Sequence, residues 1–88
     1  MNVYLAKCCR RGEDDDFVGI FKSKEGVAEA CRTFEGYNNS YLRLGHGGLP
    51  QEFYDRCLWM LSKSDNIAIL PSDDCGFHFS IELVELQE

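Results

Sequence analysis

The stretch Phe17-Val18-Gly19-Ile20-Phe21-Lys22-Ser23-Lys24-Glu25 decides the fold, because it turns from a strand pattern into a helix start. Its first five residues are mostly apolar and favour a strand over residues 17–22. Ser23 suits the N-cap of a helix, and Glu25 adds a favourable charge to the first turn. Apolar residues then recur at helical spacing, at Val27, Ala30, Cys31 and Phe34. We therefore predict a helix over residues 24–35, ended by Gly36 in a left-handed cap.

The residues before this stretch predict a second strand that pairs with the first as a hairpin. Over residues 2–9, Val3, Leu5 and Cys9 alternate with Tyr4, Ala6 and Cys8, so both sides of the strand are partly apolar. That pattern is typical of an inner strand. The polar residues 10–16 form the connecting loop.

The residues after the first helix predict a short strand or extended segment over 41–44, a flexible glycine-rich loop, a helix that begins at Pro50, and two strands. The buried stripe of the second helix consists of Phe53, Tyr54, Cys57, Leu58 and Leu61, with Trp59 and Met60 at its border. The strands cover residues 67–70 and 77–86, and the core side of the last strand carries Phe77, Phe79, Ile81 and Leu83. Val84 and Leu86 break this alternation, which indicates a bulge or an apolar outer face.

The element order β-β-α-β-α-β-β predicts an α+β fold, with a mainly antiparallel sheet and two helices packed on one face. The 88 residues are expected to form a single domain, 1–88. Hydrophobic residues make up 44% of the chain and charged residues 27%, which is typical of globular proteins and argues against disorder.

The net charge of −6 belongs entirely to the second half of the chain. Residues 1–44 hold seven basic and seven acidic side chains, whereas residues 45–88 hold two basic and eight acidic ones. Such a distribution can present an acidic face to a basic partner.

The sequence also predicts a cytoplasmic protein that crosses no membrane. No apolar run approaches the roughly 18–20 residues that a membrane helix needs, and the N-terminus lacks the pattern of a signal peptide. The five cysteines are odd in number and scattered, apart from adjacent Cys8 and Cys9, which argues against a disulfide framework.

The best candidate for a small-molecule site is the loop Gly45, His46, Gly47 and Gly48, which leads into a helix start where backbone N–H groups can hold an anion. The loop lacks the endings of the phosphate-loop and dinucleotide motifs. We therefore weigh a plain flexible connection against an anion-binding or ligand-binding loop.

Other chemistry has little support in the sequence. No C-x-x-C pair occurs and neither histidine has a partner at helical spacing, so we expect no metal and no cofactor. No nucleophile has an evident activating base, so we expect no enzyme. Basic residues near the first hairpin are interrupted by four consecutive acids, so we expect no direct nucleic-acid binding.

Residues 3–30, with Val3-Tyr4-Leu5 and Val18-Gly19-Ile20-Phe21-Lys22-Ser23-Lys24-Glu25, resemble the strand-into-helix unit of small uncharacterised bacterial and phage domains. These domains have no known active site to carry over. The protein is also a small acidic chain without catalytic motifs, and in this general type it resembles phage anti-defence inhibitors, including anti-CRISPR proteins. The resemblance implies a host cytoplasm as location and, as target, a complex that handles nucleic acid.

The leading hypothesis is a small non-enzymatic module that binds a protein partner with a basic surface, anchored by exposed aromatic residues such as Tyr37, Tyr41 or Trp59. The predicted contact residues are acidic: Asp65, Asp73, Asp74, Glu82, Glu85 and Glu88, with Asp14, Asp15 and Asp16 as a second patch. One alternative is the ligand-binding loop. Another is a homodimeric structural protein that pairs through Val84 and Leu86.

Overall fold

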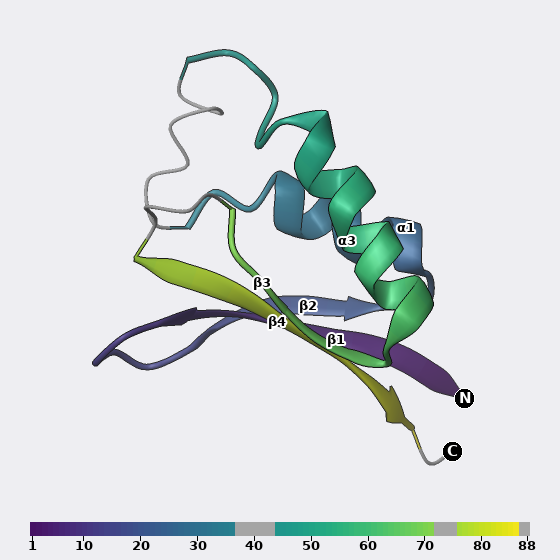
Figure 1. Ribbon diagram of the computed structural model, residues 1–88. Helices are drawn as coiled ribbons and strands as arrows, with labels where there is room; N and C mark the ends of the chain where they lie inside the picture. The colour runs from purple at the N-terminus through teal and green to yellow at the C-terminus, as the bar shows by residue number, and fades with distance from the viewer. Residues whose placement is uncertain (37–43, 72–75, 87–88) are drawn as a thin grey trace.

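Four antiparallel strands form one sheet in the computed structural model, which describes residues 1–36, 44–71 and 76–86 (Figure 1). The order across the sheet is β2-β1-β4-β3. The strand bounds are β1 Asn2–Arg10, β2 Asp16–Phe21, β3 Asn66–Ile69 and β4 Phe77–Glu85. The predicted α+β fold is confirmed, as are the hairpin of β1 with β2 and the inner position of β1.

Two helices, α1 (Lys24–Arg32) and α3 (Gln51–Lys63), lie on the same side of the sheet (Figure 1). Ser23 caps α1 as predicted, because its hydroxyl accepts a hydrogen bond of 3.0 Å from the backbone N–H of Gly26. The predicted end of α1 is wrong. The helix ends at Arg32, where Thr33 bonds back to the carbonyl of Glu29 through both its N–H and its hydroxyl. Gly36 has no left-handed backbone, so it does not act as the cap.

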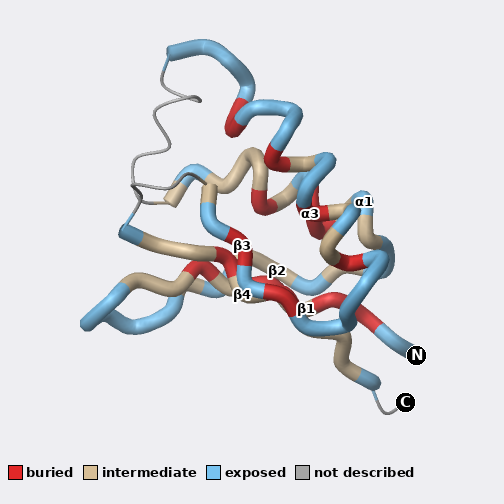
Figure 2. The backbone as a smooth tube through the Cα atoms, viewed as in Figure 1, coloured by how far each residue is buried: buried red, intermediate tan, exposed pale blue. Residues whose placement is uncertain are grey.

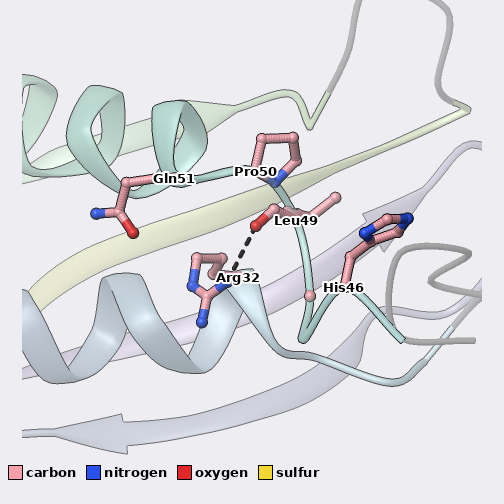
Figure 3. A pocket seen from close by; sticks show the side chains of 6 residues that line it. Arg32, His46, Leu49, Pro50 and Gln51 are labelled. Atoms are coloured by element: carbon pink, nitrogen blue, oxygen red, sulfur yellow. Dashed lines mark hydrogen bonds between the residues drawn. The ribbon is translucent and has the colours of Figure 1, made fainter. Parts of the chain in front are cut away.

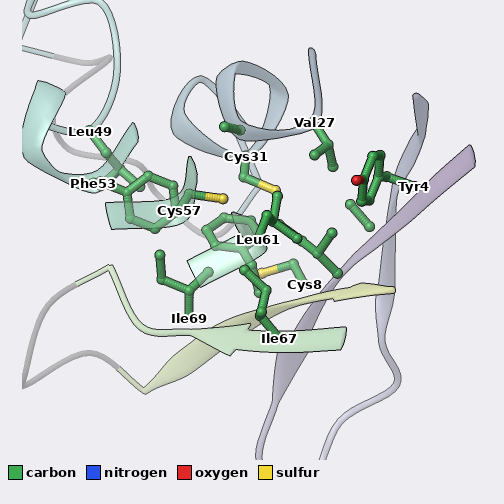
Figure 4. Packing of buried hydrophobic residues seen from close by; sticks show 14 residues of the cluster. Tyr4, Cys8, Val27, Cys31, Leu49, Phe53, Cys57, Leu61, Ile67 and Ile69 are labelled. Carbon is green, nitrogen blue, oxygen red and sulfur yellow. The ribbon is translucent and has the colours of Figure 1, made fainter. Parts of the chain in front are cut away.

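The core lies between the sheet and the two helices (Figures 2 and 4). Phe79 is its centre: the side chain is 1% exposed, and its ring packs edge-on against those of Phe34, Phe53 and Phe77 at centroid distances of 5.7–6.0 Å. Small residues of β1, Ala6 and Cys8, leave room for these rings. The prediction that Phe77, Phe79, Ile81 and Leu83 form the core side of the last strand is confirmed.

A β-bulge lies in β2 and not in the last strand. β4 pairs with β1 without a break from Phe77 to Glu85, whereas the β1–β2 register shifts between Ala6 and Lys7. Ala6 pairs with Gly19 and Lys7 pairs with Phe17, so Val18 is the extra residue. Val18 packs against the core, and Phe17 and Ile20 therefore both point to the opposite side of the sheet.

Three further predictions need correction or lie outside the described residues. The predicted segment 41–44 lies outside them except for Leu44, which is in a turn. Pro50 is the N-cap of α3 and not its first helical residue. Trp59 does not border a buried stripe but projects from α3 with 64% of its surface exposed.

Candidate functional site

One face of the sheet carries both helices, and we call the opposite one the uncovered face (Figure 1). The strand registers assign residues to it, because side chains that are paired across strands share a face and neighbours along a strand alternate. Between the hairpin and the chain ends, it carries Met1, Val3, Leu5, Lys7, Cys9, Phe17, Ile20, Asn66, Ala68, His78, Ser80, Glu82, Val84 and Leu86.

Apolar side chains form a continuous strip on this face. Leu86 donates its backbone N–H to the carbonyl of Met1 at 2.8 Å, which extends the β1–β4 pairing by one step. Next along the strip are the pairs Val3 with Val84 and Leu5 with Ile20, and then Phe17. Val3 is buried, at 2% exposure. The most exposed members of the strip are Phe17 at 61%, Met1 at 54%, Ile20 at 51% and Leu86 at 43%. Exposed apolar surface of this kind marks interaction sites in soluble proteins.

Charged and polar side chains border this strip. Lys7 lies beside Phe17 on the neighbouring strand, and Glu82 lies beside Leu5. Neither forms an ion pair with another described residue. His78 and Ser80 continue the polar side toward β3. The face therefore combines an apolar centre with a polar border, as protein interfaces do.

The structure separates the predicted acidic residues into two groups. Glu82, Glu85 and Asp65 lie at one end of the sheet, where the backbone N–H of Leu83 donates to the carbonyl of Asp65 at 2.9 Å. Asp14, Asp15 and Asp16 lie in the β1–β2 hairpin at the other end. Asp73, Asp74 and Glu88 lie outside the described residues, as do Tyr37 and Tyr41. Because β4 is an inner strand, the acids of the last strand do not form an edge of the sheet.

The glycine-rich loop borders a hollow of about 390 Å³, together with Arg32, Leu49, Pro50 and Gln51 (Figure 3). Arg32 fastens the loop to the end of α1: its guanidinium donates to the Leu49 carbonyl at 3.1 Å, and its own carbonyl accepts from the Leu49 N–H at 2.8 Å. A Cβ at Gly48 would lie 2.6 Å from that Arg32 carbonyl, so the close approach requires glycine.

The same hollow holds the start of α3, which has no side-chain cap, and the exposed His46. The uncapped start of a helix attracts anions. However, the Arg32 guanidinium also pairs with Glu29, and this contact lowers the pKa of the Glu29 carboxyl and raises the pKa of Arg32. Part of the positive charge is therefore neutralised within α1. The anion-binding loop stays a prediction.

The described cysteines are free thiols. Cys8, Cys31 and Cys57 are fully buried in the core (Figure 4), where burial raises the pKa of Cys57 to about 11 and raises the pKa of Cys31 further. Partial burial and the neighbouring Asp15 also raise the pKa of Cys9. Raised pKa values disfavour the thiolate, so Cys9, Cys31 and Cys57 are not activated as nucleophiles.

Over residues 1–36, 44–71 and 76–86, no group of three or more acidic, histidine or cysteine side chains comes together as a metal site would require. Within the same residues, no helix is both long and apolar enough to span a membrane.

Two features were missed in the sequence. The first is the strip formed by Leu5, Ile20 and Phe17. The apolar character of both sides of residues 2–9 was the signal for it, but the bulge that turns Phe17 and Ile20 to one face has no pattern of its own. The second is Arg32, whose contact with Leu49 spans 17 residues. Comparisons with protein-family models, curated proteins and solved structures found no match for this chain, so its function is argued from the geometry.

Proposed function

We propose that this protein is a non-enzymatic binding module that contacts a partner protein through the uncovered face of its sheet. The observation that supports this is the apolar strip from Met1 and Leu86 to Phe17, whose two ends are exposed while Val3 between them is buried. An antiparallel sheet commonly has one solvated face, but that face normally carries polar side chains. Here Met1, Phe17, Ile20 and Leu86 are apolar and 43–61% exposed, so a partner that covers them gains the free energy of their burial.

The charges around the strip indicate the kind of partner. Glu82 lies on the face, and Glu85 and Asp65 lie at the end of the sheet where the strip begins. A protein surface with an apolar centre and basic side chains beside it would complement this arrangement. The proposal therefore keeps the basic partner that was predicted from the sequence. It differs in that apolar contacts are expected to supply most of the binding free energy.

The size of the face sets the expected affinity. Strands about 4.8 Å apart and with a rise of about 3.4 Å per residue give a face on the order of 500 Å². A standard protein interface buries about 800 Å² on each partner. Contact through this face alone is therefore expected to be weak and transient, and a tight complex would need the partner to reach beyond it.

The test compares variants that alter the face with one that alters another exposed apolar residue. Leu86→Asp and Glu82→Lys change the face, and Trp59→Ser is the matched control on the outer side of α3. Proteins captured from a cell lysate by each version would be identified, and their binding measured with purified components. The proposal requires a partner that binds the wild type and Trp59→Ser but not Leu86→Asp. A partner lost only by Trp59→Ser, or equal binding by all versions, would contradict it.

Inhibition of a nucleic-acid-handling complex is a narrower version of this proposal. An acidic protein that competes for a DNA-binding groove should lose affinity when salt rises from about 0.1 M to about 1 M, as the Debye length falls from ~10 Å to ~3 Å. If the affinity changes neither with salt nor with charge reversal at Asp73 and Asp74, this version is excluded. The proposed apolar contact is not affected by that result.

A further inference from the structure

The two edges of the sheet in the described part of the chain differ in how they are protected. β3 has four residues, is followed by Pro71, and ends where the Arg56 side chain donates to the carbonyl of Leu70. β2 has six residues, and from Phe17 to Phe21 it contains neither a charge nor a proline. Charges and prolines are the usual means of preventing an edge strand from pairing with another chain. From Phe17 to Phe21 the edge of β2 lacks them and keeps only the bulge, and its charges lie at its two ends.

Two exposed apolar side chains lie beside this same edge. Phe17 and Ile20 are 61% and 51% exposed, and both lie on the uncovered face. A strand added at the edge of β2 would lie directly next to them. The core side of the strand is already filled, because Val18 and Phe21 pack against the core.

The charges at the two ends of β2 select the partner strand. The acids Asp14, Asp15 and Asp16 lie at its start, and Lys22 and Lys24 follow its end. When two such strands pair antiparallel, the acidic end of each strand lies beside the basic end of the other, so the pair has two sites of opposite charge. A parallel pair would bring like charges together, which is unfavourable. The charges of β2 are thus complementary to those of β2 in a second copy of the chain.

We propose that β2 pairs antiparallel with β2 of a second copy, so that two sheets join into one around a twofold axis. In the matching register, Phe17 lies opposite Ile20 of the partner subunit, and Asp15 lies opposite Lys22 of the partner subunit. The bulge allows this register, because it puts Phe17 and Ile20 on the same face although they are three residues apart. The dimer leaves the Met1, Val84 and Leu86 end of the uncovered face open in both copies.

The first test is the oligomeric state of the full chain by sedimentation velocity and light scattering. We expect the wild type to dimerise reversibly, and Ile20→Lys to raise the dissociation constant about tenfold or more. Trp59→Lys removes another exposed apolar side chain, on α3 instead of β2, and should leave the dimer unchanged. A wild type that stays monomeric at high protein concentration would overturn the proposal without affecting the proposed partner binding.

Charge exchange tests the pairing directly. One variant carries Asp14→Lys and Asp15→Lys, and the other carries Lys22→Glu and Lys24→Glu. Each should be monomeric, because both ends of its β2 then have the same charge, and circular dichroism checks that each is folded. Mixed together, they should form a heterodimer, since each end again faces the opposite charge. If both variants still dimerise alone, or if the mixture of folded variants stays monomeric, β2 pairing is wrong.

Discussion

At the scale of single residues, chemistry is governed by burial more than by residue type. Five cysteines and two histidines offer many donors, yet the described thiols are either packed in the core or held protonated by their surroundings. The sequence indicated buried roles for Cys31 and Cys57 from their positions on apolar helix faces, because helical spacing reports the buried side directly. It could not indicate the Arg32–Leu49 contact, which depends on how the loop returns to α1.

The buried thiol of Cys57 predicts a loss of stability at high pH. Its pKa is about 11 in the folded protein and 9.0 in the unfolded chain, so its contribution is present below pH 9 and disappears as the pH rises to 11. The loss is about 3 kcal/mol at most, at 1.36 kcal/mol for each pKa unit. Chemical denaturation from pH 8 to pH 11 should therefore show a steeper fall for the wild type than for Cys57→Ala. Parallel curves would contradict the assignment.

Substitutions at Gly48 and Gly45 distinguish the cost of a steric clash from the cost of backbone strain. Both have positive φ, at 122° and 82°, but a Cβ at Gly45 would meet open space. We expect Gly45→Ala to cost about 1 kcal/mol through backbone strain, and Gly48→Ala to cost about 1–3 kcal/mol more because it collides with the Arg32 carbonyl. Urea midpoints measure both. Equal costs would show that the loop does not approach α1 closely.

At the scale of elements, one side of each strand packs in the core and the other side lies on the uncovered face. The core side of β4 was predictable, because its alternation of apolar and polar residues reports one buried face. The outer side was ambiguous, since Val84 and Leu86 fit either a bulge or an apolar outer face, and the unbroken register of β4 favours the second. The bulge in β2 depends on the pairing of two strands and could not be located from one of them.

Two isoleucines on opposite sides of the sheet test this division. Ile81 is 0% exposed on the core side, and Ile20 is 51% exposed on the uncovered face. Replacing Ile81 with alanine should cost about 2–5 kcal/mol, because it removes buried methyl groups and leaves a cavity. The same replacement at Ile20 should cost less than about 1 kcal/mol in dilute protein. Similar values for the two variants would mean that the uncovered face is in fact covered.

At the scale of the whole molecule, α1 and α3 lie on one side of the sheet, and over residues 1–36, 44–71 and 76–86 no helix lies on the other. The fold class followed from the order of elements, whereas the contact surface did not. The acidic residues pointed to a charged face, but the register of the strands separates those that are described into two groups toward opposite ends of the sheet. Apolar residues that are far apart in the sequence, such as Met1, Ile20 and Leu86, come together instead.

The central claim is that this second face is exposed to solvent, and methyl NMR with a soluble paramagnetic probe measures it directly. In dilute protein, the methyl groups of Val84 and Leu86 should relax several-fold faster with the probe than those of Ile67, Ile69 and Ile81, which lie under the helices. Equal protection of both sets would show that the face is already covered, and would contradict this account.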